Sequence, residues 1–168
     1  MPDKNLTTVP FGKHKGRTFS WVALHDPDWL YWSIEEGIWE DKVLVLKEEA
    51  HMIGLLSQNI AIPNNEEGNL KVLYITDTNT GKFQTFEVVD ASEWDSYSYG
   101  GMVSDVIDLS MPRKLSTYDK TGGRLMLSAL KFYYYGDESY RFTEKRCHEF
   151  FTNRTHFDLD RLKKAVGI

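Results

Sequence analysis

Residues 9–37 read VPFGKHKGRTFSWVALHDPDWLYWSIEEG, and they contain the strongest local signals in the chain. Gly12 and Gly16 bracket a basic KHK tripeptide. Because glycine adopts backbone angles that are closed to other residues, we predict a tight turn or small hairpin here. Thr18 is well placed to cap a short helix immediately after the turn. The stretch therefore begins with a turn followed by a helix.

A second helix is specified more fully between residues 26 and 37. Asp26 suits the N-cap, Pro27 the first helical position and Asp28 the positive end of the helix dipole. Gly37 suits the C-terminal stop. The apolar residues of this helix recur at three- and four-residue spacing and are predicted to face a core. They are Trp29, Leu30, Trp32 and Ile34.

The remaining sequence predicts an α+β fold. Residues 70–77 and 82–90 alternate β-branched and aromatic residues around a TNTG turn, which indicates a central antiparallel β-hairpin. We predict that the N-terminal glycine turn and helices form a module, residues 1–40, packed as one unit with the α+β remainder, residues 41–168. The other predicted elements are a mostly helical segment at 42–62, a long loop around Gly100, a short strand at 103–109, and C-terminal helices at 124–135, 143–153 and 158–165.

Composition bounds the class of protein. The chain has 168 residues, 41% of them apolar and 14% aromatic, which is enough for one hydrophobic core. Its one cysteine, Cys147, cannot form an internal disulfide. No signal sequence or membrane-spanning apolar run is apparent. We therefore expect a cytoplasmic protein without a membrane partner.

Charge is distributed unevenly along the chain. The net charge is −5. Residues 35–110 hold 4 Lys/Arg against 15 Asp/Glu, whereas residues 111–146 hold 8 against 4. The N-terminal 34 residues are weakly basic. A basic face therefore exists only if the fold brings the two basic segments together.

The basic turn is a candidate phosphate-binding element. In an extended backbone, Lys13, Lys15 and Arg17 would share one edge, with His14 on the other side. Cations along an edge, with Gly16 allowing close backbone approach, suit a nucleic-acid backbone. Nearby aromatic residues would offer stacking surfaces for bases. The alternative is a solvated turn with buried tryptophans behind it.

A second basic segment follows, MPRKLSTYDKTGGR. It contains Arg113, Lys114, Lys120 and Arg124. We predict that Arg113, Lys114 and Arg124 form a second phosphate contact, with a helix beginning at the Gly122-Gly123 pair. The alternative is an ordinary basic loop. The segment lacks the Gly-Lys-Ser/Thr of a P-loop, so nucleotide hydrolysis is not expected.

The glycine turn and the helix after it resemble a known pattern. FGKHKGR followed by DPDWLYW is similar to the exodeoxyribonuclease X-like C-terminal domain, and also to a related family of small quorum-sensing-regulated virulence factors. The resemblance covers about residues 9–40. It implies an accessory nucleic-acid-binding role without catalysis. The residues that match are Phe11, Gly12, Lys13, Lys15, Gly16, Pro27, Leu30 and Trp32.

Together these features predict a non-catalytic nucleic-acid-binding accessory protein of phage or bacterial origin, acting on DNA rather than RNA. The site residues are Lys13, His14, Lys15, Gly16, Arg17, Arg113, Lys114 and Arg124. No catalytic residue, cofactor or metal site is predicted. One alternative is an acidic protein-interaction factor that regulates or inhibits a host or DNA-processing enzyme. Another is a metal-dependent nuclease.

Overall fold

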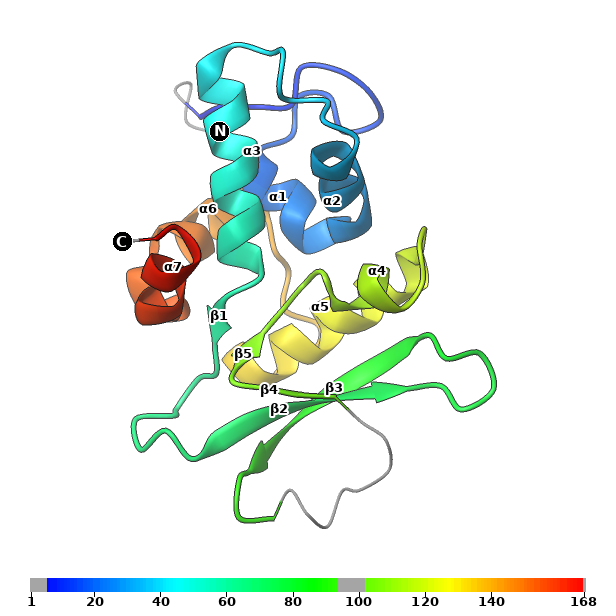
Figure 1. Ribbon diagram of the computed structural model, residues 1–168, viewed down its shortest axis with the longest axis vertical. Coiled ribbons are helices and arrows are strands. Elements are labelled where there is room, and N and C mark those ends of the chain that lie inside the picture. Colours follow the sequence, from blue (N-terminus) through cyan, green and yellow to red (C-terminus); the bar gives the residue numbers. More distant parts are fainter. Residues whose placement is uncertain (1–5, 94–101, 168) are drawn as a thin grey trace.

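The computed structural model describes residues 6–93 and 102–167. Within this part of the chain the fold is α+β, as predicted, with helices at both ends and strands between them (Figure 1). The helices are α1 Phe19–His25, α2 Pro27–Glu35, α3 Leu44–Ser57, α4 Met111–Leu115, α5 Lys120–Tyr135, α6 Glu144–Thr152 and α7 Leu159–Ala165, with a 3-10 helix, η2, at Arg154–His156. The strands are β1 Ile60–Ala61, β2 Leu70–Thr76, β3 Phe83–Asp90, β4 Met102–Ser104 and β5 Val106–Ile107.

The predicted hairpin is the centre of a three-stranded antiparallel sheet of order β3-β2-β4. Tyr74 of β2 lies opposite Phe86 of β3 and Met102 of β4, so both neighbours pair with the same strand. A separate two-stranded sheet pairs β1 with β5 through Ile60 and Ile107. The single strand predicted at residues 103–109 is therefore two short strands in different sheets.

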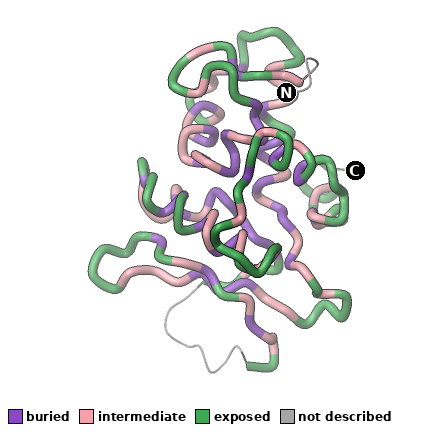
Figure 2. The backbone as a smooth tube through the Cα atoms, turned by 180° about the vertical axis from the view of Figure 1, so that it is seen from behind, coloured by how far each residue is buried: buried purple, intermediate pink, exposed green. Residues whose placement is uncertain are grey.

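Helix α5 connects the two layers of the molecule. It lies between the three-stranded sheet and the N-terminal helices (Figure 1), packing against β3 on one side and against α1 and α2 on the other. Met126 and Leu130 of α5 join Val22 and Leu30 of the N-terminal helices in one buried apolar cluster. Buried stretches run along the middle of the molecule, whereas the turns at its ends are exposed (Figure 2).

The helix boundaries mostly follow the predicted caps. Thr18 accepts a hydrogen bond from the backbone N–H of Trp21, and Asp26 accepts one from that of Trp29, so both residues are N-caps as expected. Thr143 and Asp158 cap α6 and α7 in the same way. These hydrogen bonds satisfy backbone donors that would otherwise have no partner at a helix start.

One predicted helix begins at another residue, and one helix was not predicted. Helix α5 begins at Lys120 rather than at the glycine pair, because Asp119 caps it by accepting from the N–H of Gly122. The short helix α4, which begins with a Met-Pro pair, was not predicted. Part of the predicted loop around Gly100 and of the N-terminal tail lies outside the described residues.

Candidate functional site

The glycine turn closes on itself instead of running as an extended edge. The N–H of Val9 donates to the carbonyl of Arg17, and the N–H of Gly16 donates to that of Val9, both at 2.8 Å. Gly12 and Gly16 have φ values of 79° and 87°, which a residue with a side chain rarely adopts. The prediction of a turn or small hairpin is confirmed.

This closed turn sends its side chains in different directions. The Lys13 Nζ and the His14 Nε2 both approach one carboxylate oxygen of Asp26, at 2.7 Å and 2.9 Å. Arg17 instead pairs with Glu144 of α6 at 3.3 Å and lies over the ring of Trp21. The expectation of Lys13, Lys15 and Arg17 along one edge was therefore wrong, because consecutive turns replace the extended backbone.

The first turns of α2 and α5 lie against each other. Gly123 in α5 faces Pro27 in α2, and a methyl group at Gly123 would lie only 3.4 Å from the proline ring. A methyl group there would make only an ordinary van der Waals contact, so the two helix starts pack closely without requiring a glycine at this position. This packing places the start of α5, with Lys120 and Arg124, beside the glycine turn that is tied to Asp26. The two basic segments, separated by about a hundred residues, thus converge.

A cavity of about 270 Å³ opens where they meet, and we call it the cap pocket because the N-caps of α2 and α5 line it. Its charged lining residues are Lys13, Asp26, Asp28, Asp119, Lys120 and Arg124. The imidazoles of His14 and His25 and the backbone at Gly123 complete it.

Two carboxylates of the cap pocket have partners of opposite charge. Asp26 accepts from Lys13 and His14. Burial alone would raise the pKa of Asp26, but these hydrogen bonds outweigh it and hold this pKa below its usual range. Asp28 accepts from Arg113 of α4 at 3.0 Å. Both groups are therefore neutralised as ion pairs.

The third carboxylate, Asp119, is buried at the start of α5. Its Oδ1 accepts from the N–H of Gly122, and its Oδ2 has no hydrogen-bond partner among the described residues. The partial positive charge at the N-terminus of α5 offsets its negative charge. Lys120 and Arg124, by contrast, are exposed and pair with no carboxylate in the described parts of the chain. Apart from the buried Asp119, the charged side chains of this pocket that have no ion-pair partner in the described residues are the cations Lys120 and Arg124.

His25 forms another wall of the cap pocket. Its ring stacks on Trp21 with 4.1 Å between centroids, and its Nδ1 lies 2.9 Å from the Trp21 carbonyl. Burial lowers the pKa of His25. At neutral pH the ring is therefore uncharged, and the lysines and the arginine supply the positive charge.

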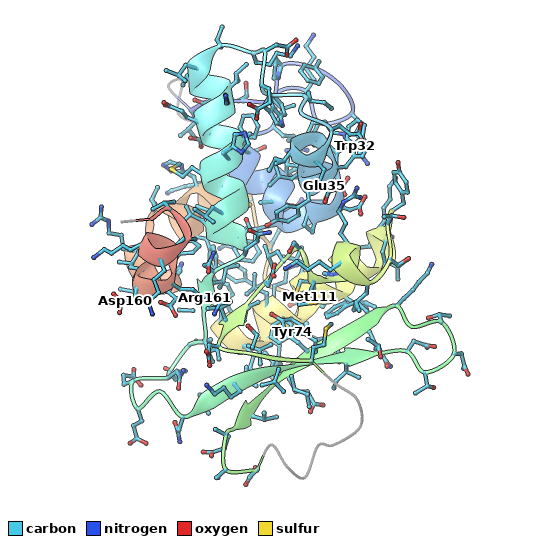
Figure 3. All side chains as sticks on the ribbon, viewed as in Figure 1. Trp32, Glu35, Tyr74, Met111, Asp160 and Arg161 are labelled. Atoms are coloured by element: carbon cyan, nitrogen blue, oxygen red, sulfur yellow. The ribbon has the colours of Figure 1, made fainter. Side chains whose placement is uncertain are left out.

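Arg113 and Lys114, which were predicted as phosphate contacts, hold the fold together instead. The Arg113 side chain is only 9% exposed and donates to Asp28 and to Glu35, the latter at 2.7 Å. Figure 3 shows Glu35 on the side of α2 that lies nearer α4. The Lys114 Nζ lies 2.7 Å from the buried Asp108. Both cations already have partners.

A second cavity, of about 210 Å³, adjoins the cap pocket, and we call it the aromatic pocket. It is lined by Lys13, Asp28, Trp29, Trp32, Tyr118 and Lys120. Lys13, Asp28 and Lys120 also line the cap pocket, so the two cavities share a wall. Lys15, Gly16 and Arg17 line neither cavity, although Lys15 is exposed on the same turn.

The apolar spacing of α2 predicted that both of its tryptophans face the core. The structure does not bear this out for Trp32. Leu30 is fully buried and Trp29 packs, partly buried, against the core, whereas Trp32 is partly buried and lies outside the core cluster. Trp32 lies at the outer edge of α2 (Figure 3). The fully buried tryptophan is Trp39, which donates through its Nε1 to Ser33. Tyr118 was not predicted as a site residue. Its signal in the sequence is that of an aromatic residue in a polar loop next to a cation.

The other chemistry-bearing groups are structural. Cys147 is fully buried, and burial raises the pKa of its thiol to about 12. His156 stacks on Phe150 at 4.3 Å. Over residues 6–93 and 102–167, no group of three or more His, Cys, Asp or Glu is arranged to hold a metal ion. No helix in that same part is both long and apolar enough to cross a membrane.

Comparison of the chain with protein-family models, with curated proteins and with solved structures finds no match. The resemblance of residues 9–40 to the exodeoxyribonuclease X-like C-terminal domain therefore stays a prediction. The geometry of the two adjoining cavities is the basis for assigning a function.

Proposed function

We propose that the protein is a non-catalytic accessory protein that binds nucleic acid, DNA in the first place, through the cap pocket. One observation supports this most strongly. Lys13 from the glycine turn and Lys120 and Arg124 from α5 line one cavity, although the sequence separates them by more than a hundred residues. Lys120 and Arg124 have no carboxylate partner in the described residues, and a phosphate would share Lys13 with Asp26. A phosphate backbone is the ligand class that such a cluster of cations fits.

Two of the cations of the cap pocket come from one helix end. The N-terminal turn of α5, a helix of 16 residues, borders the cavity and carries two of its cations, while the Asp119 carboxylate already occupies the backbone N–H of Gly122 at this helix end. Lys120 and Arg124 add full charges on the same turn. We leave Arg113 and Lys114 out of the proposed contact surface, since carboxylates already occupy them.

The resemblance of the glycine turn to an accessory domain of DNA-processing enzymes supports the same proposal. Lys15 and Arg17 lie on this turn outside the cavities, so we assign them a supporting role as peripheral charges. Such a role places the protein in the cytoplasm, with access to nucleic acid.

The test is the salt dependence of binding to single- and double-stranded DNA. We compare the wild type with Lys120→Ala/Arg124→Ala and with Lys163→Ala/Lys164→Ala, which removes the same charge from exposed positions on α7. If both pocket cations contact phosphates, the first variant flattens the slope of log affinity against log salt. The expected change is about 1.4 units for single strands and about 1.8 for duplex.

Two results would contradict the proposal. One is the absence of measurable binding by the wild type at low salt. The other is an equal change of slope in the two double variants, which would mean that net charge and not the cap pocket determines binding.

A second function, a protein-interaction factor, is favoured by an exposed apolar cluster at the start of α3. Val43, Leu44 and Val45 at the helix start are 64%, 66% and 57% exposed, and Met52, about two turns further along α3, is 50% exposed. Such a cluster beside acidic residues such as Glu40 suits a protein partner. A stoichiometric partner that is lost in Leu44→Ser/Met52→Ser, together with no DNA binding, would favour this function over the first.

A further inference from the structure

Tyr118 combines two features that a merely structural residue does not need. Its side chain is 72% exposed, and its φ of 61° lies in the left-handed region, which strains a residue that is not glycine. Strained backbone of this kind persists only when the surroundings hold it in place. The strained backbone at Tyr118 therefore points to a functional role for this residue.

The surroundings do hold Tyr118 in place. Its backbone N–H donates to the Oδ1 of Asp28 at 3.1 Å, and its carbonyl accepts from the N–H of Lys120 at 3.2 Å. The Arg113 guanidinium lies 5.8 Å from the centre of its ring. Asp28 is itself fixed by Arg113. The buried ion pair of Arg113 thus anchors the loop that presents an exposed aromatic ring.

Trp29 and Trp32 line the aromatic pocket together with Tyr118 of this loop. Their rings are 6.2 Å apart between centroids and tilted by 50°. Trp32 is half-buried, so part of its surface is accessible to a ligand. Together with Tyr118 they give the cavity flat apolar walls, while Lys13 and Lys120 place two positive charges at its border.

We propose, building on the proposed function, that the aromatic pocket takes an unpaired base of single-stranded nucleic acid. The base stacks on Tyr118 and Trp32. Its phosphates contact Lys13 and Lys120, and the strand continues toward Arg124 in the cap pocket. Every base has a π-face, so this stacking is sequence-tolerant. The paired bases of a duplex are covered on both faces, so the protein prefers single strands.

Because the two cavities share a wall, the occupant of the aromatic pocket must suit both its flat rings and the cations at its border. An apolar peptide segment would fill the aromatic pocket but would leave Lys120, which has no carboxylate partner in the described parts of the chain, without a counter-charge. A nucleotide satisfies both parts at once, because flat base and anionic phosphate are joined at short range. The complementarity of charge and shape therefore favours a nucleic-acid strand.

The experiment separates base from phosphate. We measure fluorescence anisotropy with three probes of equal length: a single-stranded DNA, the same strand with abasic sites throughout, and the duplex. We expect the abasic strand, which keeps all the phosphates, to bind about 10-fold more weakly than the normal strand. An RNA strand of the same sequence distinguishes the two kinds of nucleic acid.

Variants at the exposed ring provide the control. Tyr118→Ala is expected to weaken binding of the normal strand about 10-fold and to leave binding of the abasic strand unchanged. Tyr118→Phe keeps the stacking face and is expected to bind as the wild type does. Trp32→Ala is expected to follow Tyr118→Ala.

The outcomes distinguish this inference from the proposed function. Equal affinity for normal and abasic strands, with an intact salt dependence, overturns the stacking and leaves phosphate binding in place. Equal losses on both strands in Tyr118→Ala also overturn it, because the substitution would then act on the fold. The absence of binding to all probes overturns the proposed function and this inference together.

Discussion

Two pairs of cations from one short segment behave differently. Arg113 and Lys114 on α4 pair with carboxylates, and the Arg113 side chain is almost completely buried. Lys120 and Arg124, a few residues later on α5, are exposed and line the cap pocket. The composition of the segment does not separate them. What separates them is where the acidic residues of other elements lie.

The partners of Arg113 are remote in the sequence. Asp28 and Glu35 are 85 and 78 residues away, and both are on α2. Contact between α2 and α4 brings them to Arg113, whereas α5 turns its first residues toward the glycine turn. Lys120 and Arg124 are therefore available to a ligand because, among the described residues, no carboxylate forms an ion pair with them, although carboxylates line the same cavity.

The largest expected effect is on stability, and it distinguishes the two pairs directly. Arg113→Ala leaves Asp28 without its cation in a largely buried position, which should lower the free energy of unfolding by about 3 kcal/mol. Arg124→Ala is the same substitution at an exposed position and should change it by less than about 0.5 kcal/mol. Urea unfolding monitored by tryptophan fluorescence measures both. Equal losses would contradict the division into structural and available cations.

The next effect concerns the glycine pair between the two regions. A methyl group at Gly122 would lie 2.7 Å from Asp119 Cγ and 2.9 Å from Pro112 Cβ, so Gly122→Ala should destabilise the fold by about 1–3 kcal/mol. Gly123→Ala meets only the edge of Pro27 and gains helix propensity, so its effect should be near zero. Thermal unfolding of the two variants checks this. If Gly123→Ala were the more damaging, the packing of α5 described above would be wrong.

A smaller effect is expected at Lys13, which is an intermediate case because Asp26 occupies it. Asp26→Asn keeps a capping oxygen for α2 but removes the charge that holds Lys13. We expect DNA affinity at low salt to rise about fivefold, since roughly 1 kcal/mol of competing attraction is removed. Titration of the wild type and the variant at one salt concentration measures this. Lower affinity in the variant would show that Asp26 positions Lys13 for the ligand.

The smallest effect is the pH dependence of stability from His25. Its pKa in the folded protein lies below the ordinary histidine value of 6.5, because burial disfavours the charged ring. As pH falls below 6.5 the unfolded chain takes up this proton first, so stability decreases until pH passes the folded pKa. His25→Gln should reduce the decrease in unfolding midpoint between pH 7.5 and pH 5.5. An identical decrease in both proteins would assign it to other groups, such as His156, whose pKa burial also lowers.

Local features of the fold were predictable, and long-range ones were not. The caps at Thr18, Asp26 and Thr143 and the hairpin around residues 77–82 follow from nearest neighbours in the sequence, and the structure has them. The start of α5 was misplaced because Asp119 was not recognised as a cap, although its spacing from Gly122 is the usual one.

The candidate site was predictable only in its ingredients. Lys13 and Arg124 were predicted as site residues because each lies beside glycines and other cations in the sequence. That they line one cavity depends on the packing of Gly123 against Pro27, which no local pattern indicates. The exposure of Trp32 could not be predicted either, since its spacing on α2 suits a core residue. Tyr118 becomes notable only through its backbone conformation and its contact with Asp28.

Lysine footprinting tests the central claim most directly, because it compares the available and the occupied cations within one unmodified protein. The protein is briefly acylated with and without single-stranded DNA, and the modification of each lysine is measured by mass spectrometry. We expect DNA to protect Lys13 and Lys120 and to leave the modification of Lys114, Lys82 and Lys163 unchanged. Protection of Lys114 or Lys163 equal to that of Lys120, or none at Lys13 and Lys120 when DNA is bound, would contradict it.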